Sequence, residues 1–467
     1  MRSGILFATR IARVLLPALG LVTCAGQPAA LCAQVKSYPP VDKPPMGWNS
    51  WDSYGTTINE SQVRANADWM AAHLKAYGWQ YITVDMEWFV KNPKPEGNAR
   101  DSRYEMDSDG RFQPSIERFP SSMNGSGFKP LADYIHSLGL KFGIHVLQGI
   151  PRGAVQQNLP IAGSAFHAQD AADPSATCRW NFDNYDPKNN AAGQAYYDSL
   201  ASMYAAWGVD LIKIDCISAS PYKGDEIRMF SAALAKTGRP IVLSLSPGPT
   251  PVEKMAEVEQ LANMWRISGD IWDIWESGQD YPRGLNEQFA KTADWASAPR
   301  DGHYPDADML PLGYLGPAAG WGEPRQTRLS HDEQRALLTL WGISRSPLVM
   351  GGSLINNDDW TTSLLTNREF LSVDQDAHNP RVPILTESNV VWTSEPNDGK
   401  GFYVALFNRT NVVRTLHYSW REIGIPEGKY RVRDLWEHRD MGASKDVSVT
   451  LPPHASALWR LMPSAEN

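Results

Sequence analysis

The feature that most constrains the fold is an alternation of strand-like and helix-like stretches between Met46 and about Gly352. Eight short apolar stretches predict strands, at residues 47–51, 80–88, 140–146, 210–218, 240–246, 264–271, 307–312 and 347–350. Helix-like stretches separate them, and two of these end at Gly139 and Gly208, which are typical helix stops. Eight units of this kind predict an α/β fold, a (β/α)₈ TIM barrel. A doubly wound open sheet is the alternative, although no glycine-rich phosphate turn follows the first strand.

Beyond about Asp376 the helical periodicity is absent. Short alternating runs separated by turn residues lie at 390–394, 401–408, 413–418, 430–436, 447–451 and 455–461. They predict a C-terminal antiparallel β-sandwich domain. We therefore expect a catalytic barrel over residues 34–376 and a β domain over 377–467.

Residues 1–33 have the composition of a secretory signal peptide. Arg2, Arg10 and Arg13 precede or enter an apolar stretch that is too short to span a bilayer, and small residues follow up to Ala33. The stretch 21–24 has some likeness to a lipoprotein box, although Thr before the Cys fits poorly. We expect cleavage after Ala33 and export to the periplasm or the extracellular space. No later segment is apolar enough to cross a membrane.

Cleavage would change both the net charge and the cysteine content. It removes three arginines and no acidic residue, so the net charge falls from −8 to −11. A surface this acidic argues against nucleic acid as a partner. Only Cys178 and Cys216 remain, and two cysteines in an exported chain favour a disulfide.

Charged, polar or aromatic residues stand at the ends of most predicted strands. These residues are Trp51, Asp85, Glu87, His145, Lys213, Asp215, Ser246, Arg266, Asp270, Asp306 and Asp308. Singly each could be structural, and Lys213 with Asp215 could form a structural ion pair. In a barrel, however, they would meet at the C-terminal face, where TIM-barrel enzymes carry their active sites.

Two carboxylates among such polar and aromatic groups suit glycoside hydrolysis. The chain also has 18 Trp and 17 Tyr, and an excess of flat rings is common where sugars are stacked. No serine nucleophile elbow is present. Metal binding is the competing use of carboxylates. His303 with Asp301, Asp306 and Asp308 is a weak calcium candidate, and the run 331–333 is typical of a helix opening. We expect no metal and no organic cofactor.

Five motifs resemble glycoside hydrolase family 27, which includes the melibiase-type α-galactosidases and α-N-acetylgalactosaminidases. They are MGWNSWDSYG at 46–55, KIDC at 213–216, WRISGD at 265–270, PDADML at 305–310 and SVDQDA at 372–377. The resemblance implies a barrel followed by an antiparallel β domain, and hydrolysis that retains the anomeric configuration. It places the nucleophile at Asp215 and the acid/base at Asp270, with Asp273 as a weaker candidate for the acid/base.

The resemblance also implies the sugar contacts and one disulfide. The contacts fall on Trp51, Asp85, His145, Lys213, Ser246, Arg266 and Asp308. The family disulfide falls on Cys178 and Cys216. We expect Lys213 to lie beside Asp215, and Arg266 to point at substrate rather than at Asp270.

Two departures from the family pattern affect the choice of sugar. Asp85-Met86-Glu87-Trp88 stands where α-galactosidases carry Asp-Asp-Cys-Trp, whose paired acids bind the axial hydroxyl and the hydroxymethyl group of galactose. Leu245-Ser246-Pro247 replaces a triplet that senses the substituent at carbon two. The first expectation is an exported retaining exo-glycosidase of the α-galactosidase type acting on carbohydrate. The alternatives are a family member for β-L-arabinopyranosides, α-N-acetylgalactosaminides or isomalto-oligosaccharides, or a carbohydrate-binding barrel without catalysis.

Overall fold

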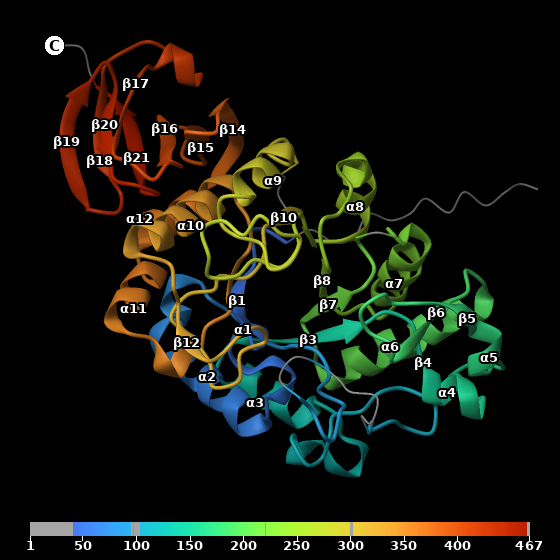
Figure 1. Ribbon diagram of the computed structural model, residues 1–467. Helices are drawn as coiled ribbons and strands as arrows, with labels where there is room; N and C mark the ends of the chain where they lie inside the picture. Colours follow the sequence, from blue (N-terminus) through green and yellow to red (C-terminus); the bar gives the residue numbers. More distant parts are fainter. Residues whose placement is uncertain (1–40, 95–96, 98–102, 220, 299–301, 465–467) are drawn as a thin grey trace, which may run out of the picture. The chain divides into compact units, whose positions relative to one another are not determined.

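The computed structural model describes residues 41–94, 97, 103–219, 221–298 and 302–464 (Figure 1). The predicted signal peptide lies outside these residues. Eight parallel strands form one sheet in the order β10-β9-β8-β7-β3-β2-β1-β13. They are β1 (Met46–Asn49), β2 (Tyr81–Val84), β3 (Lys141–Leu147), β7 (Leu211–Asp215), β8 (Val242–Leu245), β9 (Met264–Arg266), β10 (Tyr304–Asp306) and β13 (Leu348–Met350).

The eight strands close into a barrel. β1 pairs with β13, and a parallel bridge between Leu310 and Met350 joins the end of β10 to β13. The N–H of Leu310 donates to the carbonyl of Val349 at 2.7 Å across this junction. Spatial neighbours are also neighbours in chain order, without the reversal of a doubly wound sheet. The predicted (β/α)₈ fold is confirmed.

Helices connect the strands around the outside of the barrel (Figure 1). They are α1 (Trp51–Tyr54), α2 (Glu60–His73), α3 (Lys129–Ser137), α4 (Arg152–Gln157), α5 (Ala168–Ala171), α6 (Ala191–Trp207), α7 (Gly224–Lys236), α8 (Met255–Leu261), α9 (Gln288–Asp294), α10 (His331–Ser344), α11 (Asp359–Leu365) and α12 (Arg368–Gln375). The start of α10 has a capping box, in which the Ser330 and Glu333 side chains each accept a backbone N–H of the other. The acidic run 331–333 is therefore a helix opening, as predicted. No helix among the described residues is long and apolar enough for a membrane span.

Two parts of the barrel differ from the sequence prediction. The seventh strand, β10, ends at Asp306 instead of occupying 307–312, because Asp308 takes a left-handed backbone with φ 97° and ends the extended run. In the loop region after β3, a small antiparallel sheet forms from β4 (Ile150–Pro151), β5 (Ala172–Thr177) and β6 (Asn184–Pro187). Its polar, mostly short strands gave no apolar alternation to detect.

The C-terminal part is an antiparallel β-sandwich, as predicted. A six-stranded sheet has the order β14-β15-β16-β21-β18-β19, and β17 pairs with β20. The strands are β14 (Ala377–Leu385), β15 (Asn389–Pro396), β16 (Phe402–Asn408), β17 (Arg414–Ser419), β18 (Tyr430–Asp434), β19 (Arg439–Ser444), β20 (Asp446–Leu451) and β21 (Ser456–Pro463). β14 and β19 were not predicted. Both are edge strands, and the first contains two prolines while the second is mainly exposed and polar.

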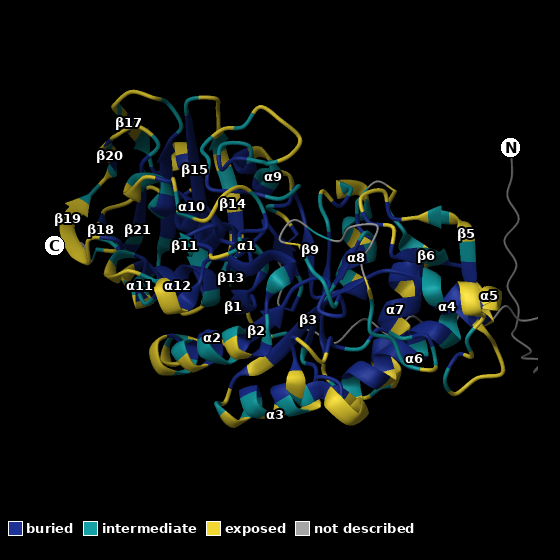
Figure 2. Cartoon of the chain, turned by 60° about the horizontal axis from the view of Figure 1, so that its bottom comes forward, coloured by how far each residue is buried: buried dark blue, intermediate teal, exposed yellow. Residues whose placement is uncertain are grey.

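The β domain packs against α10 of the barrel. Trp436 donates its indole N–H to the hydroxyl of Thr339 at 2.9 Å, and that hydroxyl lies 3.0 Å from the hydroxyl of Ser456. One apolar core is continuous from the barrel strands into β15, β16 and β21. Figure 2 shows the central strands buried and the outer face of helices such as α3 exposed. The barrel is thus a rigid support for the loops at its C-terminal face.

Candidate active site

The carboxyl ends of the barrel strands carry most of the predicted site. Asp215 is the last residue of β7 and Arg266 is the last of β9. Asp85 and Ser246 directly follow β2 and β8, and His145 lies within β3. Because the carboxyl ends of the parallel strands meet at one face of the barrel, these side chains converge there.

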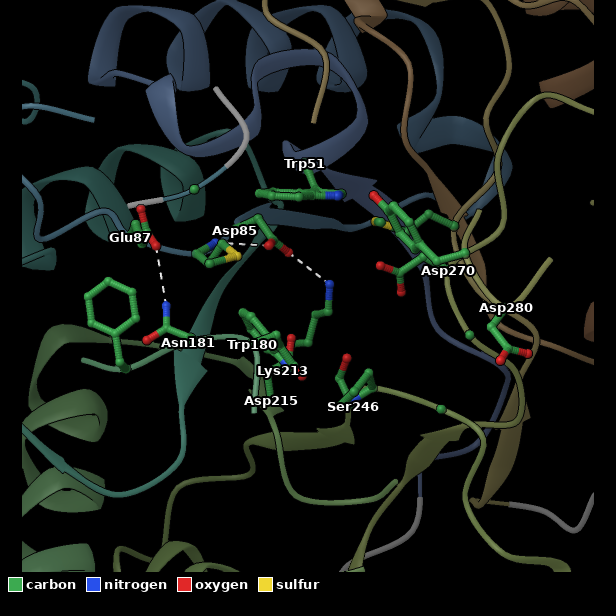
Figure 3. Close-up of a pocket in the computed structure, with 18 residues that line it drawn as sticks. Trp51, Asp85, Glu87, Trp180, Asn181, Lys213, Asp215, Ser246, Asp270 and Asp280 are labelled. Atoms are coloured by element: carbon green, nitrogen blue, oxygen red, sulfur yellow. Dashed lines mark hydrogen bonds and ion pairs between the residues drawn. The ribbon is translucent and has the colours of Figure 1, made fainter. Parts of the chain in front are cut away.

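A cavity of about 500 Å³ opens at this face (Figure 3). Six of the nine predicted catalytic and sugar-binding side chains line it: Trp51, Asp85, Lys213, Asp215, Ser246 and Asp270. The other three, His145, Arg266 and Asp308, are buried behind them. His145 contacts Asp215, and Arg266 contacts both Asp270 and Asp308. The structure thus brings all nine predicted residues together, in a space the size of a small-ligand pocket.

Asp215 is held tightly at the end of β7. Its carboxylate accepts the backbone N–H of Cys216 at 2.6 Å, and the Nε2 atom of His145 lies 3.0 Å from its other oxygen. Cys216 has φ 63°, so the chain turns sharply directly after Asp215. Asp215 is 7% exposed, which leaves its carboxylate a narrow opening to the cavity. A carboxylate fixed in this way suits a nucleophile.

Lys213 lies near enough to Asp215 for the two charges to interact, as expected, but its ion pair is with Asp85 rather than with Asp215. Its ammonium group lies 3.0 Å from a carboxylate oxygen of Asp85, which also accepts the side-chain amide of Asn49 at 2.7 Å. Lys213 and Asp215 are two residues apart on a strand, but the lysine chain is long enough to reach across β3 to β2. Burial alone would raise the pKa of Asp85, and the charge of Lys213, with smaller contributions from His145 and two hydrogen bonds, holds it well below its usual range.

Asp270 lies in a different environment from Asp215. It is on the loop after β9, its side chain is 36% exposed, and it accepts a hydrogen bond from Arg266 at 3.1 Å. The expectation that Arg266 points at substrate rather than at Asp270 is therefore wrong. Arg266 is four residues before Asp270, and the loop folds back so that the fully buried guanidinium finds a charge partner.

Arg266 also pairs with Asp308, at 2.8 Å. Asp308 accepts the backbone N–H of Ile271 at 2.8 Å, which fixes the loop next to Asp270. Burial raises the pKa of Asp308 above its usual range, and the carboxylates of Asp270 and Asp306 add to this, although Arg266 opposes it. Asp308 therefore positions both Arg266 and the Asp270 loop.

Trp51 forms one wall of the cavity. It begins α1, and its backbone N–H donates to the side chain of Asn49 at 2.9 Å. A Cβ atom at Gly320 would lie 2.6 Å from the indole ring, so glycine is needed where the two chains meet. The ring is therefore fixed from behind and presents a flat surface to the cavity (Figure 3).

Asp273, the weaker candidate for the acid/base, has a structural position. Its side chain is completely buried and forms ion pairs with Arg325 at 2.6 Å and Arg328 at 2.9 Å. It does not line the cavity. Because both carboxylate oxygens are occupied by these arginines, it is not placed to exchange a proton with substrate.

The predicted disulfide is present between Cys178 and Cys216. Cys216 follows Asp215, whereas Cys178 lies just after β5 in the loop before α6. The bond therefore links a long surface loop to the backbone beside the candidate nucleophile.

Glu87, one of the predicted strand-end residues, also lines the cavity, but sequence reasoning missed other lining residues: Met309 and, from the loops, Trp180, Asn181, Phe182, Asp280 and Tyr281. Asn49, which positions Asp85 and Trp51, was also missed as a site residue. Its place inside the motif GWNSW was a usable signal. For the loop residues no strand end or periodicity pointed to the cavity.

The weak calcium candidate finds no support among the described residues. Asp301 lies outside them, and the Nδ1 atom of His303 is 2.7 Å from the carbonyl of Ala262. No group of three His, Cys, Asp or Glu side chains in the described parts of the chain could hold a metal ion.

The arrangement has the groups needed for acid/base-assisted displacement. One cavity holds a buried carboxylate with fixed hydrogen bonds, a more exposed carboxylate on a loop, a flat indole surface, and a Lys-Asp pair that can bind hydroxyl groups. Two carboxylates of this kind are the catalytic groups of glycoside hydrolysis.

Comparisons with known proteins agree with this chemistry. Residues 43–155 and 188–376 match the family described as Alpha galactosidase A, and residues 386–461 match the Alpha galactosidase C-terminal beta sandwich domain. An α-galactosidase from Cyamopsis tetragonoloba is 30% identical over 428 residues, which cover 90% of this chain and 86% of that protein.

Two solved structures are more similar still. A family 27 β-L-arabinopyranosidase from Geobacillus stearothermophilus is 45% identical with a TM-score of 0.87, over 91% of this chain and 98% of that one. A putative α-N-acetylgalactosaminidase from Bacillus halodurans is 40% identical with a TM-score of 0.80, over 91% of this chain and 100% of that one. The chain therefore belongs to glycoside hydrolase family 27 and is a glycoside hydrolase.

Proposed function

We propose that the enzyme is a retaining exo-glycosidase for terminal sugars of galacto configuration, and that it prefers β-L-arabinopyranosides to α-D-galactosides. The observation that carries the preference is Met86, which lines the cavity next to Asp85. In the α-galactosidases that this chain resembles, an acid at that position binds the hydroxymethyl group of galactose.

The two sugars differ only in the substituent on carbon five of the ring. An α-D-galactopyranoside and a β-L-arabinopyranoside have the same ring configuration, but the pentose has hydrogen in place of the hydroxymethyl group. A thioether is a weak hydrogen-bond acceptor, so a hydroxyl buried beside Met86 would lose a partner. Such a loss costs about 1–3 kcal/mol. The 45% identity with a β-L-arabinopyranosidase supports the same choice.

The catalytic roles follow from the two environments. Asp215 attacks the anomeric carbon and forms a covalent glycosyl ester, while Asp270 gives its proton to the glycosidic oxygen and the leaving group departs as an alcohol. Asp270 then takes a proton from water. The water oxygen bonds to the anomeric carbon, the ester to Asp215 breaks, and the configuration is retained. Asp85 and Lys213 bind sugar hydroxyls, and Trp51 stacks against the ring.

The alternative substrate is an α-D-galactoside, which the sequence expectation placed first and which the named relatives favour. A direct comparison decides between them. We expect kcat/KM for p-nitrophenyl β-L-arabinopyranoside to exceed that for p-nitrophenyl α-D-galactopyranoside, with product of retained configuration by NMR. A higher value for the galactoside would reverse the preference, and no turnover of any glycoside in a wider panel would favour a carbohydrate-binding barrel without catalysis.

We also propose that the enzyme is exported. The predicted signal peptide and the Cys178–Cys216 disulfide support this, because disulfides persist in oxidising compartments. Fractionation of cells that express the full chain, with mass measurement of the mature N-terminus, tests it. Protein that stays in the cytoplasm with residues 1–33 attached would contradict it.

A further inference from the structure

We propose that the exposed rings of Trp180 and Tyr281 form the binding site for the leaving group, and that this group is a sugar ring. The inference rests on the proposed exo-glycosidase function and extends it to the other side of the cleaved bond. The glycosidic oxygen must reach Asp270, so the leaving group occupies the part of the cavity that opens past this residue.

Large exposed aromatic residues are concentrated at the mouth of the cavity. Trp180 is 46% exposed, Phe182 39% and Tyr281 46%, and all three line the cavity. Among the Phe, Tyr and Trp residues that the structure describes, the only other ring of comparable exposure is Phe166, at 37%, and it does not line the cavity. Exposed aromatic surface at a cavity mouth is typical of ligand contact, because burial of these rings by protein packing would otherwise be favourable.

The loop that carries Trp180 and the loop that carries Tyr281 are each fixed beside one catalytic carboxylate. Trp180 is two residues after Cys178, whose disulfide partner Cys216 directly follows Asp215. Tyr281 is two residues before Arg283, whose backbone N–H donates to the carbonyl of Asp270 at 2.8 Å. The loops are therefore positioned relative to the reacting atoms, rather than free to vary.

The polar groups around Tyr281 also favour a sugar ring at this site. Partial burial and the nearby carboxylate of Asp270 raise the pKa of the Tyr281 phenol above its usual range, so the phenol remains a neutral hydrogen-bond donor. Asp280, next to it, lines the cavity and is fully exposed. An aromatic face with hydrogen-bonding groups at its edge suits a hydroxylated ring, which has an apolar C–H face and polar edges.

The Trp180 loop lies outside the parts of the chain that match the Alpha galactosidase A family. The match to the Alpha galactosidase A family is interrupted between residues 155 and 188, and Trp180 and Phe182 fall in that interval. Figure 3 shows Trp180 among the residues that line the cavity. Loops at the mouth of a barrel site are where members of one fold differ in specificity.

The test compares two substrates that carry the same sugar and differ in the leaving group. One is β-L-arabinopyranosyl fluoride, whose leaving group is a single atom, and the other is a disaccharide with the arabinopyranosyl residue linked to galactose. We expect Trp180→Ala and Tyr281→Ala each to lower kcat/KM for the disaccharide about tenfold or more, and for the fluoride less than threefold.

Two controls separate stacking from structural damage. Tyr281→Phe keeps the ring and should retain most of the activity on the disaccharide. Phe166→Ala removes an exposed ring outside the cavity and should leave both substrates unchanged. If kcat/KM falls equally for the fluoride and the disaccharide in the Ala variants, or if kcat/KM for the disaccharide is unaffected, the proposed leaving-group site is wrong. If the wild-type enzyme hydrolyses neither arabinopyranosyl nor galactosyl compounds, the proposed function itself is wrong and this site is rejected with it.

Discussion

The two sides of the cavity are built differently, and we call them the strand side, around Asp215, and the loop side, around Asp270. On one side Asp215 ends a barrel strand, is almost fully buried, and is held by His145 and the disulfide-linked turn at Cys216. On the other side Asp270 lies on a loop, is partly exposed, and shares Arg266 with Asp308. A nucleophile needs a fixed position relative to one carbon atom, whereas an acid/base has to exchange protons with both a leaving group and water.

This difference separates what the fold determines from what the loops determine. In the proposed mechanism, strand-end residues, which the closed barrel fixes, hold the sugar whose bond is cleaved. Loop residues would contact the leaving group beyond that bond. Changes to the strand side should therefore affect every substrate, while changes to the loop side should depend on the leaving group.

The largest effect is expected from Asp215→Gly. Loss of the nucleophile should lower turnover more than about a thousandfold on every substrate. Azide or formate should restore activity with an aryl glycoside and give product of inverted configuration, because the small anion attacks from the vacated side. Near wild-type rates in the variant would show that Asp215 is not the nucleophile.

Asp270→Ala should depend on the leaving group. Loss of general acid catalysis typically costs about 10²–10⁴-fold, but a very good leaving group needs no proton in the first step. We expect slow hydrolysis of sugar-linked substrates, a glycosyl-enzyme that accumulates from activated aryl glycosides, and an azide product of retained configuration. An azide product of inverted configuration would show that Asp270 is the nucleophile rather than the acid/base.

Much of the strand side was predictable from the sequence, and little of the loop side was. Seven of the eight strands overlap their predicted positions, and the seventh was placed just after β10. They could be predicted because buried parallel strands are short apolar runs, and charges at their ends, such as Lys213 and Asp215, stand out against them. The ion-pair partners of the buried cations were not predictable: Asp85 was not foreseen as the partner of Lys213, and the expectation that Arg266 points away from Asp270 was wrong. Which acid a long Lys or Arg side chain reaches depends on neighbouring strands and on how a loop folds back, as with Lys213 to Asp85 and Arg266 to Asp270. Loop aromatics such as Trp180 follow no periodicity.

Met86→Asp tests which sugar the strand side accepts. A carboxylate next to Asp85 should bind a hydroxymethyl group, so the ratio of kcat/KM for the α-galactoside to that for the β-L-arabinopyranoside should rise about tenfold. Met86→Leu keeps an apolar side chain of similar volume and should leave the ratio unchanged. A lower ratio in Met86→Asp would mean that this position does not face the carbon that carries the hydroxymethyl group.

Loss of the disulfide should weaken the connection between the Trp180 loop and the Asp215 side of the cavity. The bond joins residues 38 apart in sequence, and a loop of that size predicts a loss of roughly 2–4 kcal/mol in the free energy of unfolding on reduction. Urea denaturation of the oxidised protein and of a Cys178→Ala/Cys216→Ala variant measures it. Two free thiols in the unfolded, unreduced mature protein would contradict the bond.

The smallest effect concerns a buried cluster that supports the Asp215 side. The backbone N–H of Gln148 donates to the carbonyl of Asp215 at 3.1 Å, and its side chain donates to Asp186 at 2.7 Å. Asp186 pairs with Lys223 at 2.7 Å, and Lys223 lies 3.7 Å from Glu226. Burial raises the pKa of Glu226 to about 8, because the one lysine beside it also pairs with Asp186 and does not fully compensate the buried carboxylate.

This pKa predicts how stability changes with pH. The folded state binds one more proton than the unfolded state between the ordinary pKa of 4.5 and about 8, so the free energy of unfolding should fall as the pH rises through that window. Glu226→Gln mimics the protonated side chain and should remove part of this fall, by about 1 kcal/mol or more between pH 5 and pH 8. Urea denaturation at several pH values measures it, with the exposed Glu253→Gln as control. If the Glu226→Gln curve runs parallel to that of the wild type, Glu226 is ionised in the folded protein and its charge is balanced within the cluster.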